Sequence, residues 1–234
     1  MAAFFSNLRN TVIAGFALAF VVFLIYLSMA EFNGFVFWPF LLRWLHIGSG
    51  VMWIGLLWYF NFVQTPTMPK IPDELKGGVS RFIAPAALFW FRWGAMSTLV
   101  WGILLAAMYG YLPEALTLDL IEGFIDLKAI LIGIGMWLGI IMWFNVWFVI
   151  WPRQQKILGA MLGGPAAPAD AAPQAALASK INTYLSGPML WGMIAASHIT
   201  IWPMKIGTLG LALILGGGLI HGLYAASRKV KTTV

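Results

Sequence analysis

The sequence predicts an all-α integral membrane protein, a single helical bundle of about six transmembrane helices that occupies residues 1–234 as one domain. Hydrophobic residues make up 61% of the chain and charged residues only 9%, whereas a soluble domain carries about 25% charged residues. The apolar runs are long and unbroken, unlike the short alternating segments of a transmembrane barrel. Lipid is therefore expected to be the solvent for most of the surface.

The apolar runs and the prolines place the elements along the chain. Six spans are expected over about residues 11–29, 38–64, 85–110, 118–151, 181–202 and 208–226. The fourth is longer than the roughly 20 residues that a helix needs to cross a bilayer, so its acidic start is expected to protrude. Pro66, Pro69 and Pro72 are expected to break the chain after the second span, and Pro152 to stop the fourth. We expect residues 73–81 to form a short amphipathic segment at the membrane interface. We expect residues 153–180, which are rich in Ala, Pro and Gly, to form a mobile cytoplasmic linker.

Loop charges predict the orientation. Basic residues gather beside alternate span ends, whereas the opposite loops hold Glu31, Glu114 and Asp119 with Lys205 as their single basic residue. The positive-inside rule then places both termini in the cytoplasm. The net charge of +6 is thus typical of membrane topology, and no nucleic-acid partner is expected. The first run is too long for a cleavable signal sequence.

The sequence contains no cysteine. This excludes disulfides, thiolate metal sites, iron–sulfur clusters and covalently attached c-type haem from these 234 residues. Any redox centre here must be held non-covalently.

Ionisable residues inside spans are candidates for function because burying them in lipid is costly. His46 lies about 10 Å, and His198 about 7 Å, below the outer ends of their predicted spans. Two neutral imidazoles at one depth on facing helices have the arrangement that a six-coordinate haem iron needs. Hydrogen bonding to a neighbouring helix, or a proton relay, would explain the same residues. His221, about 20 Å below the outer start of its span, is a lesser candidate ligand.

Three further residues accompany these histidines. Arg43 precedes His46 by one turn on the same face, where a guanidinium could pair with haem propionates. Trp53 follows two turns later, and small residues near His46 would admit a macrocycle or, equally, another helix. Arg92 lies deep in the third span without an acidic partner at its depth; it could bind an anion, extend towards the cytoplasm or bond to backbone carbonyls.

Four motifs, in one order, resemble the membrane domain of the bacterial PuuD-type urate oxidase (urate hydroxylase) family. They are Leu42-Arg43-Trp44-Leu45-His46 with Trp53-Ile54-Gly55 and Tyr59-Phe60-Asn61; Phe91-Arg92-Trp93-Gly94-Ala95-Met96; Asn145-Val146-Trp147 with Ile150-Trp151-Pro152 and Gln154; and Asn182-Thr183 with Pro188-Met189 and Ala196-Ser197-His198. The histidine-to-tryptophan spacing in the first is also similar to that of small haem-b membrane proteins of the CopD-like and HemJ-like groups. The resemblance therefore favours haem b on His46 and His198.

The resemblance implies a function and a location. Family members oxidise urate to 5-hydroxyisourate in the bacterial inner membrane and pass the electrons to a c-type cytochrome, typically their own C-terminal domain. This chain ends at Val234 and contains no Cys-x-x-Cys-His, so we expect a separate cytochrome as the acceptor. Arg92 or Asn145 would contact the anionic substrate.

Two functions of other classes stay open at this point. A non-catalytic subunit of a larger respiratory or photosynthetic membrane complex would have the same aromatic-rich helices, and could have lost urate chemistry while keeping the fold. A small transporter or proton-relay protein is less favoured, because the sequence shows no inverted repeat and no pair of broken helices.

Overall fold

The computed structural model describes residues 2–29, 32–121, 123, 126–198 and 205–230, and in these residues every regular element is a helix. The chain divides into two compact units, residues 1–41 and 42–234. The first contains α1 (Ala2–Phe5), α2 (Leu8–Met29) and the start of α3 (Gly34–Trp58). The side chains of α2 are largely exposed and apolar, as expected for a helix facing lipid, and Phe23 stacks on Phe37 with ring centroids 5.5 Å apart.

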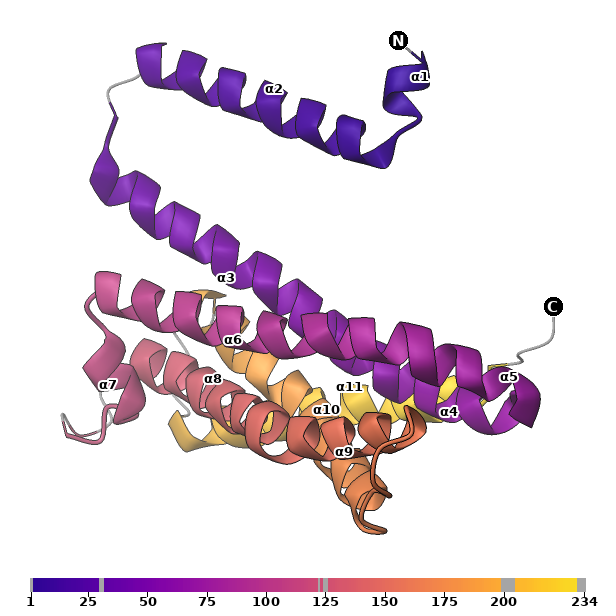
Figure 1. Ribbon diagram of the computed structural model, residues 1–234. Coiled ribbons are helices and arrows are strands. Elements are labelled where there is room, and N and C mark those ends of the chain that lie inside the picture. The colour runs from indigo at the N-terminus through magenta and orange to yellow at the C-terminus, as the bar shows by residue number, and fades with distance from the viewer. Residues whose placement is uncertain (1, 30–31, 122, 124–125, 199–204, 231–234) are drawn as a thin grey trace. The chain divides into compact units, whose positions relative to one another are not determined.

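The second unit is built from long helical runs (Figure 1). α3 continues through η1 (Tyr59–Gln64), α4 (Thr65–Thr67) and η2 (Met68–Lys70); α5 (Asp73–Gly78) continues through η3 (Val79–Ile83) into α6 (Ala84–Met108). The short α7 (Leu112–Leu116) precedes α8 (Leu127–Phe144), which runs through η4 (Asn145–Ile150) into α9 (Trp151–Met161). α10 (Ala171–His198) and α11 (Lys205–Ser227) complete the described elements.

The chain is a multi-pass membrane protein. Five runs of the described residues are long and apolar enough to cross a bilayer: Arg9–Met29, Gly34–Lys70, Asp73–Met108, Leu127–Met161 and Gly210–Ser227. α10, which contains the predicted fifth span, has 28 residues but is more polar, because it supplies buried hydroxyl and amide groups to the bundle. Residues 199–202 of that predicted span lie outside the described residues. The all-α membrane bundle is confirmed.

The predicted breaks at Pro66 and Pro152 are wrong. The π-helical segments η1, η3 and η4 each end two residues before a proline, at Pro66, Pro85 and Pro152, and the helix continues through each. A proline in an α-helix normally removes one hydrogen bond and clashes with the carbonyl four residues earlier. A π-helical turn changes the hydrogen-bond register just there, which lets the helix pass.

Three predicted boundaries also change as a result. Residues 73–81 are continuous with α6 instead of forming a separate interfacial piece. The fourth span begins at Leu127, after Asp126 accepts a hydrogen bond from the backbone N–H of Lys128 as an N-cap. Helices α9 and α10 occupy most of the predicted linker 153–180, so only residues 162–170 lie between them.

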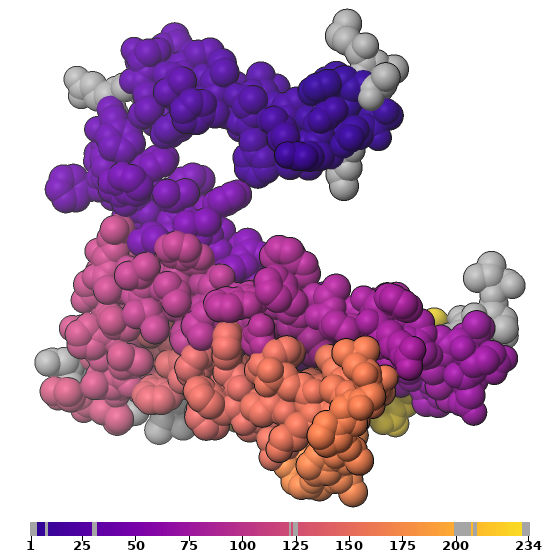
Figure 2. Space-filling model, in the orientation of Figure 1, coloured from indigo at the N-terminus to yellow at the C-terminus, as the bar shows by residue number. Residues whose placement is uncertain are grey.

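Close backbone contacts join α10 to its neighbours. A Cβ atom on Gly192 would lie 2.7 Å from the backbone nitrogen of Gly135 in α8, and one on Gly216 of α11 would lie 2.5 Å from the nitrogen of Pro188. Small residues at helix crossings allow such approach inside a membrane. In the space-filling view of Figure 2, the side chains of α6 (magenta) lie against those of α8 and α9 (salmon to orange).

Candidate functional site

The His46 side chain is held against α6. Its Nδ1 atom lies 2.8 Å from the backbone oxygen of Thr98, and its ring rests on Gly102, where an added Cβ would lie 2.8 Å from Cε1. A carbonyl oxygen only accepts, so Nδ1 carries the proton and donates. In the neutral imidazole, the Nε2 lone pair is then free, which is the tautomer that metal-ligating histidines use.

His198 has the same local arrangement in a more exposed place. It ends the described part of α10, and its Nδ1 atom lies 2.9 Å from the oxygen of Ile194, one turn earlier. By the same reasoning Nε2 is free to bind a metal. The structure gives no direct contact between His46 and His198 among the described residues. Their binding to one iron therefore stays a prediction. The donor chemistry of both residues fits an axial haem ligand.

The third histidine has a different environment. Nδ1 of His221 lies 3.2 Å from the hydroxyl of Tyr184, which can donate or accept. Tyr184 stacks on Tyr224 with ring centroids 5.5 Å apart, and Tyr224 donates to Oδ1 of Asn61 over 2.9 Å. His221 therefore belongs to a polar network between helices, and its role as a lesser ligand stays untested.

Arg43 makes its contacts at the far end of α6. Its Nη2 donates to the hydroxyl of Tyr109 over 3.0 Å, and Cζ lies 5.3 Å from the centre of that ring. Tyr109 stacks on Tyr111 with centroids 6.2 Å apart. Burial raises the pKa of the Tyr111 phenol, while the positive charge of Arg43 acts in the opposite direction. The other guanidinium donors of Arg43 are exposed, as a propionate partner would require.

Trp53 and Asn145 serve the core in this structure. Trp53 is 2% exposed and its backbone nitrogen would lie 3.3 Å from a Cβ on Gly94, so the two helices cross there. Asn145 donates from Nδ2 to Oδ1 of Asn182 over 2.8 Å, and Asn182 donates to the oxygen of Met142 over 2.9 Å. The predicted cofactor and substrate roles of these two residues stay predictions.

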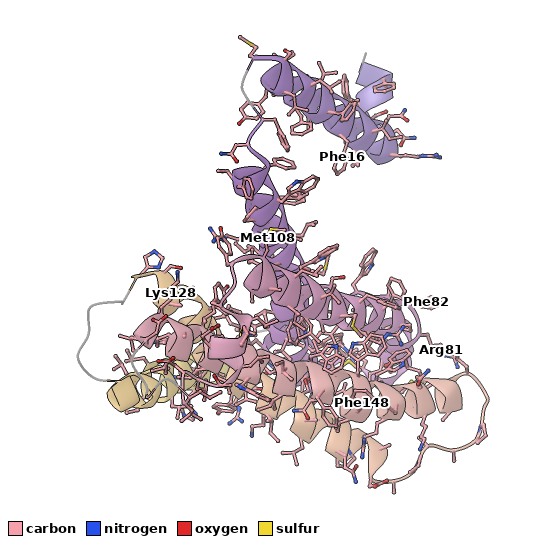
Figure 3. The ribbon with its side chains drawn as sticks, turned by 90° about the vertical axis from the view of Figure 1, so that its left-hand side faces the viewer. Phe16, Arg81, Phe82, Met108, Lys128 and Phe148 are labelled. Atoms are coloured by element: carbon pink, nitrogen blue, oxygen red, sulfur yellow. The ribbon has the colours of Figure 1, made fainter. Side chains whose placement is uncertain are left out.

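Arg92 lies in a cage of indoles. Its Cζ atom is 3.8 Å from the ring centre of Trp151, 5.2 Å from that of Trp147 and 5.7 Å from that of Trp93. Its Nε atom is buried without a hydrogen-bond partner. Figure 3 shows the helical run from η3, which contains Arg81 and Phe82, through α6 to Met108, with Phe148 of η4 below it. The unusual feature of this cation is that it contacts aromatic rings and makes no hydrogen bond to any of the described residues.

A buried polar strip on α10 was missed by the sequence analysis. Asn182, Thr183 and Ser186 have no exposed surface. Ser179 accepts from Nδ2 of Asn61 over 2.8 Å, and Ser186 accepts from Nε1 of Trp58 over 2.9 Å. These α10 residues are three, four and seven apart, the spacing of one helix face, and that spacing is the signal that could have revealed the strip. Asn61 and Asn145 both belong to π-helical segments, which are frequent at functional sites.

Part of the second unit matches a known protein family. Residues 120–233 match the family model described as urate oxidase N-terminal. This match supports a urate oxidase N-terminal domain over that part of the chain. The predicted family is confirmed by this match, which covers α8 to α11 and two of the four motifs. Neither a curated protein nor a solved structure matches the chain.

The two other motifs lie before the matched region but join it in the fold. The first motif ends at Asn61, which bonds to Ser179, and Trp58 beside it bonds to Ser186. The second contains Arg92, which rests on Trp147 and Trp151 of the matched region. The urate oxidase N-terminal domain in this protein therefore packs directly against α3 and α6.

Proposed function

We propose that this chain is the membrane part of a haem b redox enzyme that oxidises urate or a related small substrate in the bacterial inner membrane. His46 and His198 would hold the haem iron, and Arg43 a propionate. Bound haem b supplies a one-electron acceptor within the bundle. The electrons would leave to a c-type cytochrome outside these 234 residues, which contain no cysteine for covalent haem. The family match supports the urate assignment.

The observation that best supports haem binding is the hydrogen bond from His46 to the Thr98 carbonyl. It fixes the ring orientation and the tautomer, and so prepares Nε2 as a ligand before any metal binds. A buried histidine with both ring nitrogens satisfied by protein would not offer that lone pair. Oxidation of urate to 5-hydroxyisourate adds one water and releases two protons and two electrons. If His46 and His198 both hold the iron, the haem would supply electron transfer without oxygen binding.

The test is a reduced-minus-oxidised absorption spectrum of the protein purified from its own membranes. The wild type should show b-type bands that are lost in His46→Ala and in His198→Ala. His221→Ala is the matched comparison and should keep them, because the proposal places the iron on His46 and His198 alone; loss of the bands in this variant would assign the iron to His221 instead. Urate-dependent reduction of the bands, and then of added cytochrome c, would complete the assignment. A blank wild-type spectrum from haem-replete cells would overturn the proposal and leave a packing subunit as the better account.

A further inference from the structure

Arg92 carries a charge inside the candidate span Asp73–Met108 without a counter-charge. Among the described residues it makes no ion pair and no hydrogen bond; the residue as a whole is half-buried, although its Nε atom is buried. An ionisable residue in a span is costly to keep unless it pairs with another group or serves a function. Because the residue is not fully buried, a second molecule can reach it.

The indoles use only one part of the guanidinium. At 3.8 Å from the Trp151 ring centre, Cζ lies at stacking distance, so the flat face of the cation rests on that ring. The N–H bonds of arginine lie in the guanidinium plane and point outward from its edge. Stacking therefore leaves the donors unused and holds them in one orientation.

Arg92 and the neighbouring Trp147 both have buried N–H groups that lack a hydrogen-bond acceptor. Nε of Arg92 is buried and unbonded, and so is the indole N–H of Trp147, whose ring centre is 5.2 Å from the arginine carbon. Both groups are donors. A buried donor without an acceptor costs about 1–3 kcal/mol. One acceptor with negative charge would satisfy both.

We propose that Arg92 and Trp147 form a binding site for a small planar oxyanion of the urate class. The arginine edge would bind two acceptor atoms side by side, as it does with carboxylates, and the Trp147 N–H would bind a third. Urate is anionic at neutral pH, planar and rich in carbonyl oxygens. Naming urate rests on the proposed function; the anion site itself rests on the geometry around Arg92. A lipid phosphate offers similar oxyanion chemistry and is distinguished by the test.

The experiment is equilibrium dialysis of radiolabelled urate against the full-length chain in nanodiscs of phosphatidylcholine. The wild type should bind urate, and Arg92→Gln should weaken binding roughly tenfold or more, as for a lost charged hydrogen bond. Arg92→Lys should also bind more weakly, because an ammonium keeps the charge but lacks the planar pair of donors. The matched control is Arg81→Gln on the same helical run, which should bind as the wild type does.

Two further arms keep the outcome decisive. Trp147→Phe retains the aromatic ring and removes only the N–H, so it should weaken urate binding even if Arg92→Gln fails to fold. Discs containing phosphatidylglycerol test the lipid alternative: no urate bound in neutral discs, together with retention of phosphatidylglycerol by the purified wild type that is lost in Arg92→Gln, would assign a lipid headgroup and overturn the proposal. Equal urate binding by wild type and Arg92→Gln would overturn it too. Dialysis needs no haem and no turnover, so a protein that binds urate through Arg92 but lacks b-type bands would reject only the proposed function.

Discussion

Helix α6 has two polar regions that differ in their hydrogen bonding: the region that contacts His46 and the region around Arg92. Thr98 and Gly102 receive His46: a backbone oxygen accepts from Nδ1, and the missing side chain of the glycine makes room for the ring. About two turns earlier, Arg92 rests on indoles that offer it no acceptor. The first place is complete within the chain and orients a ligand atom. The second has a buried donor without a partner among the described residues, and the anion proposal places an external acceptor there.

The difference extends to the helices around each place. Beside Arg92, the chain changes from α- to π-helical hydrogen bonding in η4, and the polar strip of α10 faces the neighbouring Asn145. Around His46, the adjoining helices α3 and α6 are regular. A π-helical segment, an unbonded arginine donor and a buried amide pair therefore lie near Arg92, whereas the imidazole of His46 is held by regular helices.

Removing the amide of Asn182 should have the largest effect on the region near Arg92. Asn182→Leu leaves the Asn145 amide without its acceptor and places a branched side chain where there is no free surface. We expect the free energy of unfolding to fall by roughly 3 kcal/mol, measured by denaturant unfolding in mild detergent. Ser28→Ala on the exposed α2 is the control, and an equal loss in both variants would contradict the assigned role.

Filling the gap at Gly102 should affect the His46 region next most strongly. An alanine Cβ would lie 2.8 Å from Cε1 of His46, so the ring must move and its bond to Thr98 must lengthen. We expect a loss of about 2 kcal/mol in unfolding free energy, and a shift of the b-type bands if haem is bound. Gly48→Ala, with nothing within 4 Å of its added Cβ, should be neutral; similar results at both glycines would refute the seating of His46.

Trp151→Leu should remove the stacking surface beneath Arg92. The expected loss is about 1 kcal/mol of unfolding free energy, the size of a partly desolvated cation–π contact. Urate binding should also weaken, because the arginine edge is no longer held in one orientation. Trp90→Leu on the exposed face of α6 removes an indole that makes no contact with Arg92. If that control costs as much, general indole burial explains the result instead of stacking.

Arg43→Gln should have the smallest effect. The bond from Arg43 to Tyr109 is exposed, so its loss should cost at most about 0.5 kcal/mol. A double-mutant cycle with Tyr109→Phe measures the coupling directly. A coupling well above 1 kcal/mol would mean that Arg43 is fixed by the protein and is less available to a propionate.

The sequence by itself determined the all-α membrane class, five of the apolar spans and the family. Long apolar runs and scarce charge are properties of the chain that no packing arrangement can reverse. Four motifs in one order indicated the urate oxidase family, and residues 120–233, which contain two of them, match its N-terminal family model. The sequence also singled out Arg92 and His46 correctly as polar groups within spans, because such residues are rare there.

Only the tertiary structure decided what those residues contact. No local pattern shows that Gly102 makes room for His46, or that Trp147 and Trp151 surround Arg92, because each pair is far apart in the chain. Helices pass Pro66 and Pro152 because a π-helical turn precedes each proline, and single-residue propensities do not carry that register change. The buried strip of α10 followed helical spacing, but its direction towards Asn61 and Asn145 depended on how α10 packs between its neighbours.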